Sequence, residues 1–277
     1  MVTLGDLLLD VVVRLAAPYA PDDDVPAAIA LVPGGQAANV AAWVRALGAD
    51  ARLVARRTDD PGGRLLAGEL ERRGIELAGP LVAGERTGSV VALVAPDGSR
   101  TLASDRGAAG DLTAADVEES MMAGGDVLHV AGYTLLRSAG AEAALRLAAA
   151  ARRYGARVTV DLSTAHGIGA LGRDEMRRRV SALAPDVVFA NEAEAAAIGE
   201  PLGAVWVVKR GARGCTVEHG GELSEHAGLD VADVRDTTGA GDAFAAGFLL
   251  ERDDLAAAAR AGQVAAARCI AHVGALP

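Results

Sequence analysis

The sequence predicts an α/β fold, a three-layer αβα sandwich with a mainly parallel central sheet and a small β-sheet lid. Short β-rich runs alternate with alanine-rich segments of helical period, which is typical of parallel strands joined by crossover helices. The chain has 277 residues, of which 51% are hydrophobic, and this is enough for one sizeable core. We therefore expect a single domain over residues 1–277.

The expected elements follow from apolar periodicity and from punctuation by Gly and Pro. The clearest strands are Val127–Ala131, Arg157–Asp161, Val187–Ala190, Ala204–Lys209 and Cys215–His219. The clearest helices are Ala37–Leu47, Gly63–Arg73, Ala139–Arg153, Glu192–Ala197, Ala240–Leu250 and Leu255–His272. We read the apolar segment from Met1 to Val13 as a strand and not as a signal peptide, because it contains Asp6 and Asp10 and has no basic segment ahead of it.

Two segments interrupt this alternation, residues 11–32 and 86–104. Each contains short apolar runs with Pro and Gly, and the second has the turn Pro96–Ser99 between two such runs. They are expected to pair into a small sheet that forms a lid over one edge of the main sheet. Surface hairpins without a gating role are the alternative.

Charge and composition exclude several classes of function. The net charge of −10 gives no overall electrostatic footprint for nucleic acid or an anionic membrane. No uninterrupted apolar run of about 18 residues predicts a membrane span. Cys215 and Cys269 lie far apart and lack metal-ligand spacing, so we expect packed free thiols and a reducing, cytoplasmic location.

The most informative stretch runs from Asp236 to Phe244, a polar, glycine-rich turn that leads directly into an apolar helix. The first amides of a helix are unpaired and carry the positive end of its dipole, so this turn predicts an anion site. An acidic side chain would repel phosphate there, but it suits a base that accepts a proton from a hydroxyl. Asp242 is that candidate base. On spacing alone, a helix cap is an equally good interpretation of it.

A second glycine turn, Pro33–Gly35, precedes the helix that is expected to run to Leu47. Paired glycines permit close approach of a backbone to a ligand, and Asn39 offers both a donor and an acceptor to a polyol. Taken singly, pure turn chemistry is the better interpretation of this stretch.

Together the two stretches resemble the signature segments of the ribokinase-like, or PfkB-type, carbohydrate kinases, and the resemblance spans nearly the whole chain. Gly5-Asp6 with Asp10 resembles the first strand of that family, whose closing Asp usually binds substrate hydroxyls. Asn191 with Glu194 resembles its Asn-x-x-Glu motif, and Lys209–Gly214 resembles the strand and turn beside the nucleotide.

The resemblance implies an ATP-dependent kinase acting on a hydroxyl of a small sugar-like acceptor, with Mg²⁺. Asp242 would be the base, with an anion hole from the amides around Gly239, Ala240 and Gly241. The remaining implied roles are acceptor binding by Asp10, Gly34, Gly35 and Asn39; nucleotide binding by Asn191, Lys209, Gly211 and Gly214; Mg²⁺ binding through water by Glu194; and a monovalent cation site, for K⁺, near Asp236, Thr238 and the Gly274-Ala275 loop.

For some of these residues an ordinary structural role, without a ligand, is the alternative interpretation. Glu194 would then be a solvated acid at a helix start, Asp10 a strand-end residue in solvent, and Gly211 and Gly214 an ordinary hairpin turn. Arg106 either reaches the acceptor or is a surface arginine, which is the more common case.

The acceptor is not fixed by the sequence. Gln36 is neutral where ribose-type members usually have a basic residue, Leu8 stands where a polar residue often contacts the sugar, and Asp161 begins a segment that lacks the Asp-x-Asn-x-Arg pattern of other members. A nucleoside kinase of the same fold is the alternative, disfavoured by the few aromatic residues. A non-catalytic ligand-binding relative is disfavoured by the intact Asp242. Exposed edges of the lid make a homodimer plausible.

Overall fold

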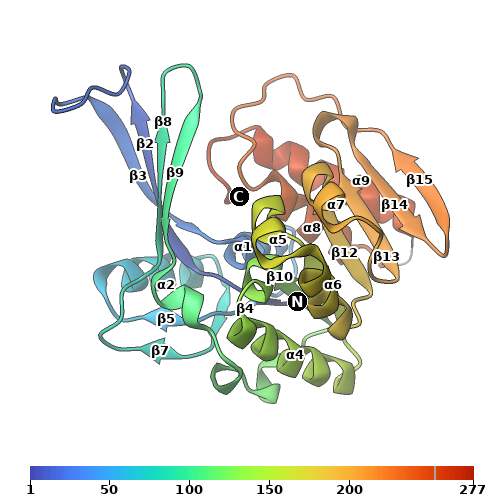
Figure 1. The fold of residues 1–277 in the computed structure, drawn as a ribbon. Coiled ribbons are helices and arrows are strands. Elements are labelled where there is room, and N and C mark those ends of the chain that lie inside the picture. Colours follow the sequence, from blue (N-terminus) through green and yellow to red (C-terminus); the bar gives the residue numbers. More distant parts are fainter. Residues whose placement is uncertain (253) are drawn as a thin grey trace.

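A computed structural model describes residues 1–252 and 254–277 of the chain. Within these residues nine strands form the main sheet, in the order β15-β14-β13-β12-β11-β10-β1-β4-β6 (Figure 1). The strands are β1 (Val2–Leu4), β4 (Arg52–Val54), β6 (Glu76–Ala78), β10 (Val127–Ala131), β11 (Arg157–Asp161), β12 (Val187–Asn191), β13 (Val205–Lys209), β14 (Cys215–His219) and β15 (Glu222–His226). The seven strands from β6 to β13 are parallel, and β14 and β15 are antiparallel to their neighbours.

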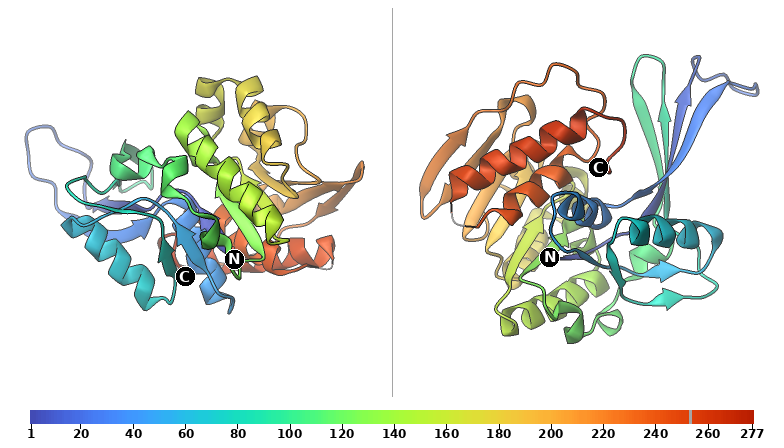
Figure 2. Two further views of the ribbon diagram at one scale, coloured as in Figure 1. Left: turned by 90° about the horizontal axis from the view of Figure 1, so that it is seen from below. Right: turned by 180° about the vertical axis from the view of Figure 1, so that it is seen from behind.

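Helices cover both faces of this sheet, which confirms the predicted three-layer sandwich. One layer contains α4 (Ser138–Arg153), α5 (Ala165–Leu171), α6 (Arg173–Ala182) and α7 (Glu192–Ile198); the opposite layer contains α1 (Gln36–Ala46), α2 (Pro61–Arg72), α8 (Ala240–Leu250) and α9 (Leu255–Ile270) (Figure 2). Short helical turns follow the small sheet and β10: η1 (Gly107–Asp111), η2 (Ala114–Asp116), η3 (Glu119–Met122) and α3 (Gly132–Leu135). Predicted and observed helix ends differ by two residues or fewer.

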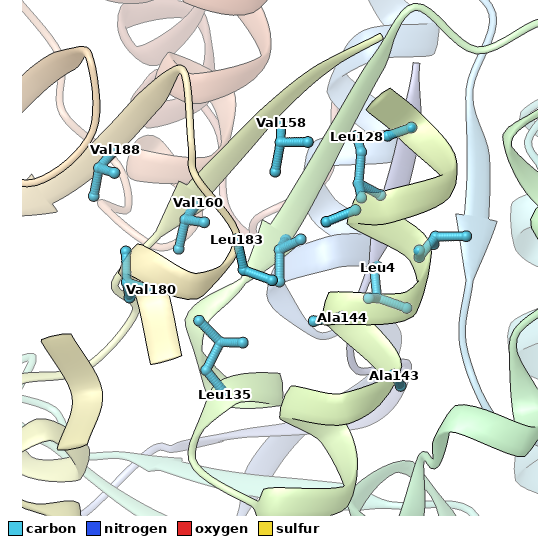
Figure 3. Packing of buried hydrophobic residues seen from close by; sticks show 14 of the residues in the cluster. Leu4, Leu128, Leu135, Ala143, Ala144, Val158, Val160, Val180, Leu183 and Val188 are labelled. Atoms are coloured by element: carbon cyan, nitrogen blue, oxygen red, sulfur yellow. The ribbon is translucent and has the colours of Figure 1, made fainter. Parts of the chain in front are cut away.

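The core lies between these layers because the central strands are apolar on both faces. On one face, Leu4, Leu128 and Val160 pack against Leu135 and Ala144, all fully buried (Figure 3). Burying a side chain of this size contributes about 1.5–3 kcal/mol.

On the opposite face α8 and α9 approach closely through small residues. A Cβ at Gly247 would lie 2.6 Å from the carbonyl oxygen of Ala261, and one at Gly262 would lie 2.9 Å from that of Phe244. These glycines therefore set the position of α8, whose first turn belongs to the site described below.

A second, four-stranded sheet projects from the sandwich and is called the small sheet here. It has the order β3-β2-β8-β9, made of β2 (Leu8–Leu15), β3 (Ala27–Gly34), β8 (Ser89–Val94) and β9 (Arg100–Asp105). The two segments predicted to pair do so, through the parallel contact of β2 with β8. A further pair, β5 (Arg57–Thr58) with β7 (Leu81–Val82), lies near its base.

The prediction of one strand from Met1 to Val13 is wrong. β1 ends at Leu4 in the main sheet, and the chain passes through Gly5 into β2 of the small sheet. A Cβ at Gly5 would lie 2.8 Å from the Cβ of Ala131, so the crossing needs a glycine there. The apolar run is continuous because its first half is buried in the main sheet and its second half is partly buried in the small sheet.

Two further predictions concern the cysteines and the membrane-spanning segments. Cys215 and Cys269 are free and buried, as predicted. In the part of the chain that the structure describes, no helix is both long and apolar enough to cross a bilayer.

Candidate active site

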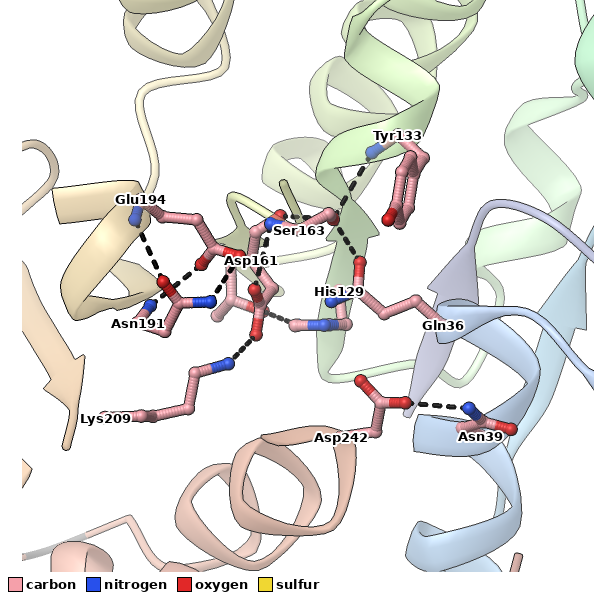
Figure 4. Close-up of polar contacts among 11 residues, drawn as sticks. Gln36, Asn39, His129, Tyr133, Asp161, Ser163, Asn191, Glu194, Lys209 and Asp242 are labelled. Atoms are coloured by element: carbon pink, nitrogen blue, oxygen red, sulfur yellow. Dashed lines mark hydrogen bonds and ion pairs between the residues drawn. The ribbon is translucent and has the colours of Figure 1, made fainter. Parts of the chain in front are cut away.

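The residues singled out from the sequence converge at one edge of the main sheet. The carboxyl ends of the parallel strands meet there, which is where ligands bind in open α/β sheets. β11 ends at Asp161, β12 at Asn191 and β13 at Lys209, while α8 and α1 bring Asp242 and Asn39 from the other layer (Figure 4).

The first turn of α8 follows a glycine in the left-handed conformation. Gly239 has φ 77°, and a Cβ on it would lie 2.6 Å from the Cα of Ala275, so only glycine fits without strain. The amide of Ala240 donates to the Thr237 carbonyl oxygen at 3.3 Å. Helix geometry leaves the amides of Gly241 and Asp242 without an intrahelical acceptor, so these two are the donors that an anion would meet.

Asp242 lies in this turn and is partly buried. Burial raises the pKa of its carboxyl to about 7, and the nearby charge of Asp161 acts in the same direction. Asn39 opposes the shift by donating from Nδ2 to Asp242 Oδ2 at 2.8 Å, as does Gln36. The carboxyl is therefore poised to gain or lose a proton near neutral pH, as general acid–base chemistry requires.

Gln36 connects this carboxyl to the strand ends on the far side. The hydroxyl of Ser163 donates to Gln36 Oε1, and Ser163 Oγ accepts from the amide of Tyr133 at 3.3 Å (Figure 4). Ser163 has φ 68°, a conformation uncommon outside glycine, and its amide donates to Asp161 Oδ1 at 3.2 Å. The neutral Gln36 is thus held in place by neighbours, which the sequence did not indicate.

Lys209 and Asp161 form a buried ion pair beside the same turn. Burial disfavours the charged ammonium, yet Asp161 and Glu194 together outweigh it, and the pKa of Lys209 is raised. A Cβ on Gly241 would lie 3.2 Å from Lys209 Nζ, so the ammonium adjoins the α8 amides. The ammonium of Lys209 and the first amides of α8 both favour a negatively charged group bound beside them.

Asn191 and Glu194 form a capping box at the start of α7. Asn191 Oδ1 accepts from the Glu194 amide at 2.9 Å, and the Asn191 amide donates to Glu194 Oε2 at 2.8 Å. Glu194 is only 4% exposed, so its interpretation as a solvated acid is wrong. Burial and the charge of Asp161 raise its pKa.

Asp10 and the glycine pair lie together at the base of the small sheet. A Cβ on Gly34 would lie 2.3 Å from the Asp10 carboxyl, and one on Gly35 would lie 2.3 Å from the Asp6 carbonyl oxygen. Asp10 is the third residue of β2 and is half-buried, so its interpretation as a strand end in solvent is wrong. Burial raises the pKa of Asp10 to about 6, against the opposing charge of Arg106.

Gly211 and Gly214 lie in the connection between β13 and β14, at the far end of the site. Their φ values are 59° and 87°, and a Cβ on Gly214 would lie 2.0 Å from the carbonyl oxygen of His226. These strands pair in antiparallel fashion, so the turn joins a hairpin, and its shape is set by contact with the end of β15. This geometry accounts for both glycines without a ligand.

Asp236 and Thr238 belong to the loop before α8. Asp236 Oδ1 accepts from the amide and hydroxyl of Thr238 at 2.9 and 2.7 Å, and Oδ2 accepts from the Gly274 amide at 3.2 Å. The two loops predicted to share a cation site are therefore neighbours. Across residues 1–252 and 254–277, no group of three or more His, Cys, Asp or Glu side chains is arranged to hold a metal ion.

Arg106 is not an ordinary surface arginine. Its guanidinium forms an ion pair with Asp6 and lies 4.3 Å from the centre of the Tyr133 ring. Asp6 is 7% exposed, and burial raises its pKa. The sequence offered only one sign of this pair, namely that Asp6 is an acid inside the apolar run from Met1 to Val13.

Comparisons with known proteins agree with this architecture. The chain is similar to an ATP-dependent ribose-1-phosphate kinase of Halopiger xanaduensis, with 33% identity over 78% of this chain and 72% of the relative. It is also similar to the structure of an adenosine kinase from Sinorhizobium meliloti, with TM-score 0.87, 26% identity and coverage of 100% and 95%. A structure described as a ribokinase II from E. coli with ATP and Mg²⁺ has TM-score 0.85 at 19% identity, covers 99% of this chain and 93% of its own, and shows the fold alone.

The fold is therefore that of the ribokinase-like kinases, which transfer phosphoryl groups to sugars or nucleosides. The model of the pfkB family of carbohydrate kinases matches residues 1–277. The chain belongs to this family and is a carbohydrate kinase.

Proposed function

We propose that this kinase transfers the γ-phosphoryl group of ATP to a hydroxyl of a small sugar-like acceptor, with Asp242 as the general base. One observation carries the proposal: the carboxyl of Asp242 lies in the first turn of α8, beside amides without an intrahelical acceptor and the ammonium of Lys209, and burial raises its pKa to about 7. The carboxylate takes the proton of the hydroxyl, while the amides and the ammonium stabilise the charge on the phosphoryl group.

The anion hole is formed by the turn Gly239–Gly241. In this proposal the amides of Gly241 and Asp242 are the main donors, and Gly239 and Ala240 shape the turn; the bond from the Ala240 amide to the Thr237 carbonyl oxygen supports this division. Asp10, Gly34, Gly35 and Asn39 hold the acceptor on the other side of Asp242. Asn39 Oδ1 is buried and has no hydrogen-bond partner among the described residues, so it is available to an acceptor hydroxyl.

The nucleotide lies toward β12 and β13. Lys209 contacts its phosphates, Asn191 faces it at the end of β12, and Gly211 and Gly214 shape the turn beside it. Glu194 would contact Mg²⁺ through water, because Mg²⁺ keeps much of its hydration shell. The absence of a three-ligand cluster in the described residues fits an ion held mainly by phosphates and water. That ion would neutralise phosphate charge, and K⁺ near Asp236 and Thr238 is part of the same proposal.

The small sheet would act as the lid of a single-domain enzyme, because β2 and β3 carry Asp10 and Gly34 at their site-facing ends.

A homodimer through this sheet is part of the proposal. Residues paired across strands share a face, and the register places Ile29, Leu31 and Val91 on the face opposite Asp10. Ile29 and Leu31 are 66% and 51% exposed. The use of ATP and the free thiols agree with a cytoplasmic location.

Three acceptor classes follow from the family and the relatives: free sugars, sugar phosphates and nucleosides. The named relatives act on ribose 1-phosphate and on adenosine. A nucleoside base needs a stacking partner, and Tyr133 at the site is already covered by Arg106. We therefore propose a sugar or sugar phosphate.

The test is release of ADP from Mg-ATP in the presence of pentoses, hexoses, their phosphates, sugar acids and nucleosides. We expect turnover on one class, reduced about a hundredfold or more in Asp242→Asn, as for loss of a general base. Asp233→Asn, the same change at an exposed aspartate, is expected to retain full turnover. Undiminished turnover by Asp242→Asn, with folding verified, would refute the assignment of the base.

A further inference from the structure

A cavity of about 220 Å³ lies beside the acceptor position, between the base of the small sheet and the start of α4. Its lining combines apolar side chains with charged and polar groups. The polar part consists of Asp6, Arg106, Tyr133, Thr134 and Arg137, and Gly110 and Gly140 contribute backbone. None of these side chains has a role in the proton transfer proposed above.

Two guanidinium groups reach this cavity, and they are held differently. Arg106 is fixed by Asp6 and by the Tyr133 ring, with 30% of its side chain exposed. Arg137 contacts Asp111 at 3.3 Å, and both side chains of that pair are about 60% exposed. An exposed pair of this kind contributes little to stability, so Arg137 is free to engage a ligand. Of the charged side chains in the lining, two are positive and one is negative.

The backbone at the cavity also favours an anion. α4 is a 16-residue helix that starts after Arg137, and no side chain of the described residues caps its amino end. The first N–H groups of α4 therefore remain available as donors, and they lie at the positive end of the helix dipole. Thr134 Oγ1, in a residue only 7% exposed, has no hydrogen-bond partner among the described residues. A buried hydroxyl without a partner is costly unless a ligand or water satisfies it.

This cavity adjoins the acceptor position and lies away from the nucleotide side. Tyr133 is linked to Asp242 through Ser163 and Gln36, and the charge of Arg106 acts on Asp10 as well as on Asp6. An acceptor with one hydroxyl at Asp242 would thus extend toward Arg106 and Arg137. A group bound there sits at the end of the acceptor remote from the transferred phosphoryl group.

We infer that this cavity is an anion subsite for the acceptor, which carries a phosphate or a carboxylate at the end remote from the hydroxyl that is phosphorylated. The inference rests on the proposed function and narrows it to anionic acceptors. Arg106 is the preformed part of the subsite, and Arg137 completes it by turning from Asp111 to the ligand. Guanidinium groups suit both oxyanions because they bind them through two parallel N–H donors.

The test compares acceptors that differ only in the anion. Ribose 1-phosphate is measured against ribose, and gluconate against glucose, with wild type, Arg137→Met and Arg137→Lys. We expect Arg137→Met to lower kcat/KM for the preferred anionic acceptor about 10- to 100-fold, as for loss of a charge-assisted hydrogen bond, without changing that for the neutral partner. Arg137→Lys is expected to lose less. Arg146→Met, an arginine elsewhere on α4, is the matched control and is expected to change neither.

Calorimetric titration of the same probes into the ATP-free protein separates this inference from the proposed function. Turnover of neutral sugars alone would overturn the anion subsite and leave the kinase proposal standing. If no acceptor turns over, binding of an anionic probe that is weakened by Arg137→Met still supports the subsite. Absence of binding by both anionic probes, or equal effects of Arg137→Met on anionic and neutral acceptors, would overturn it.

Discussion

At the scale of residues, the properties of the site depend on Asp242 and its neighbour Asn39. Proton acceptance requires the ionised carboxylate, so a pKa of about 7 predicts that kcat/KM rises with pH and reaches half its maximum near pH 7. Asn39 donates to that carboxylate and lowers its pKa. Asn39→Ala is therefore expected to move the midpoint about one pH unit upward.

The pH profile of kcat/KM in both proteins is the measurement. Recovery of activity by Asn39→Ala at high pH would mean that Asn39 acts through the base. An unshifted midpoint with a uniformly lower rate would contradict this prediction and would leave Asn39 as an acceptor contact only.

The same pKa has a consequence for stability. The pKa of the Asp242 carboxyl is about 7 in the folded chain, against an ordinary value of 3.8. The free energy of unfolding therefore falls as pH rises from about 4 through about 7. Asp242→Asn removes this loss and keeps an oxygen that accepts from Asn39. We expect the variant to melt at a higher temperature than wild type at pH 8, with a smaller difference at pH 4. An equal difference at both pH values would contradict the raised pKa.

Residue-scale features were only partly predictable. Asp242, Asn39, Asp10 and the glycines stood out because polar or glycine residues interrupt apolar periodicity at element ends. Asp161, the ion-pair partner of Lys209, did not stand out, since 48 residues separate the two and only the strand order brings them together. A single sequence carries no signal for such a pair.

At the scale of elements, that ion pair joins β11 to β13 across the intervening strand β12. Lys209→Met leaves Asp161 buried without its partner, and we expect a loss of about 3 kcal/mol in the free energy of unfolding. Adding Asp161→Asn removes the unpaired charge and is expected to restore most of that loss. Urea denaturation of wild type, both single variants and the double variant measures it. Additive losses would show that the two side chains do not act as a pair.

Element prediction succeeded where crossovers are regular and failed where strands are short. β10, β11 and β14 have the predicted bounds because each apolar run is bracketed by turns or helices. β4 and β6 were missed, since each spans only three residues and is held by pairing rather than by its own composition: β4 lies between β1 and β6, and β6 is an edge strand paired with β4. Where one apolar run serves two sheets, as before Val13, periodicity gives no boundary.

At the scale of the whole molecule, the face of the small sheet opposite Asp10 is the expected contact between two copies of the chain. Ile29 and Leu31 are exposed and apolar there, and a partner copy would cover them. We expect the protein to be a dimer in solution and Leu31→Glu to shift it to monomer, as measured by light scattering. Ala30→Glu places the same charge on the opposite face of the same strand and is the control. A monomeric wild type would contradict the dimer.

The path from β3 to α1 sets which parts of this molecule tolerate a change in length. β3 ends at Gly34 and α1 starts at Gln36, so only Gly35 separates a strand of the small sheet from the helix that presents Asn39. Residues 16–26, at the opposite end of the same strands, form a connection remote from the site (Figure 1). Insertions there would leave the chemistry intact. One residue added beside Gly35 would turn α1 by about 100° and carry Asn39 away from Asp242.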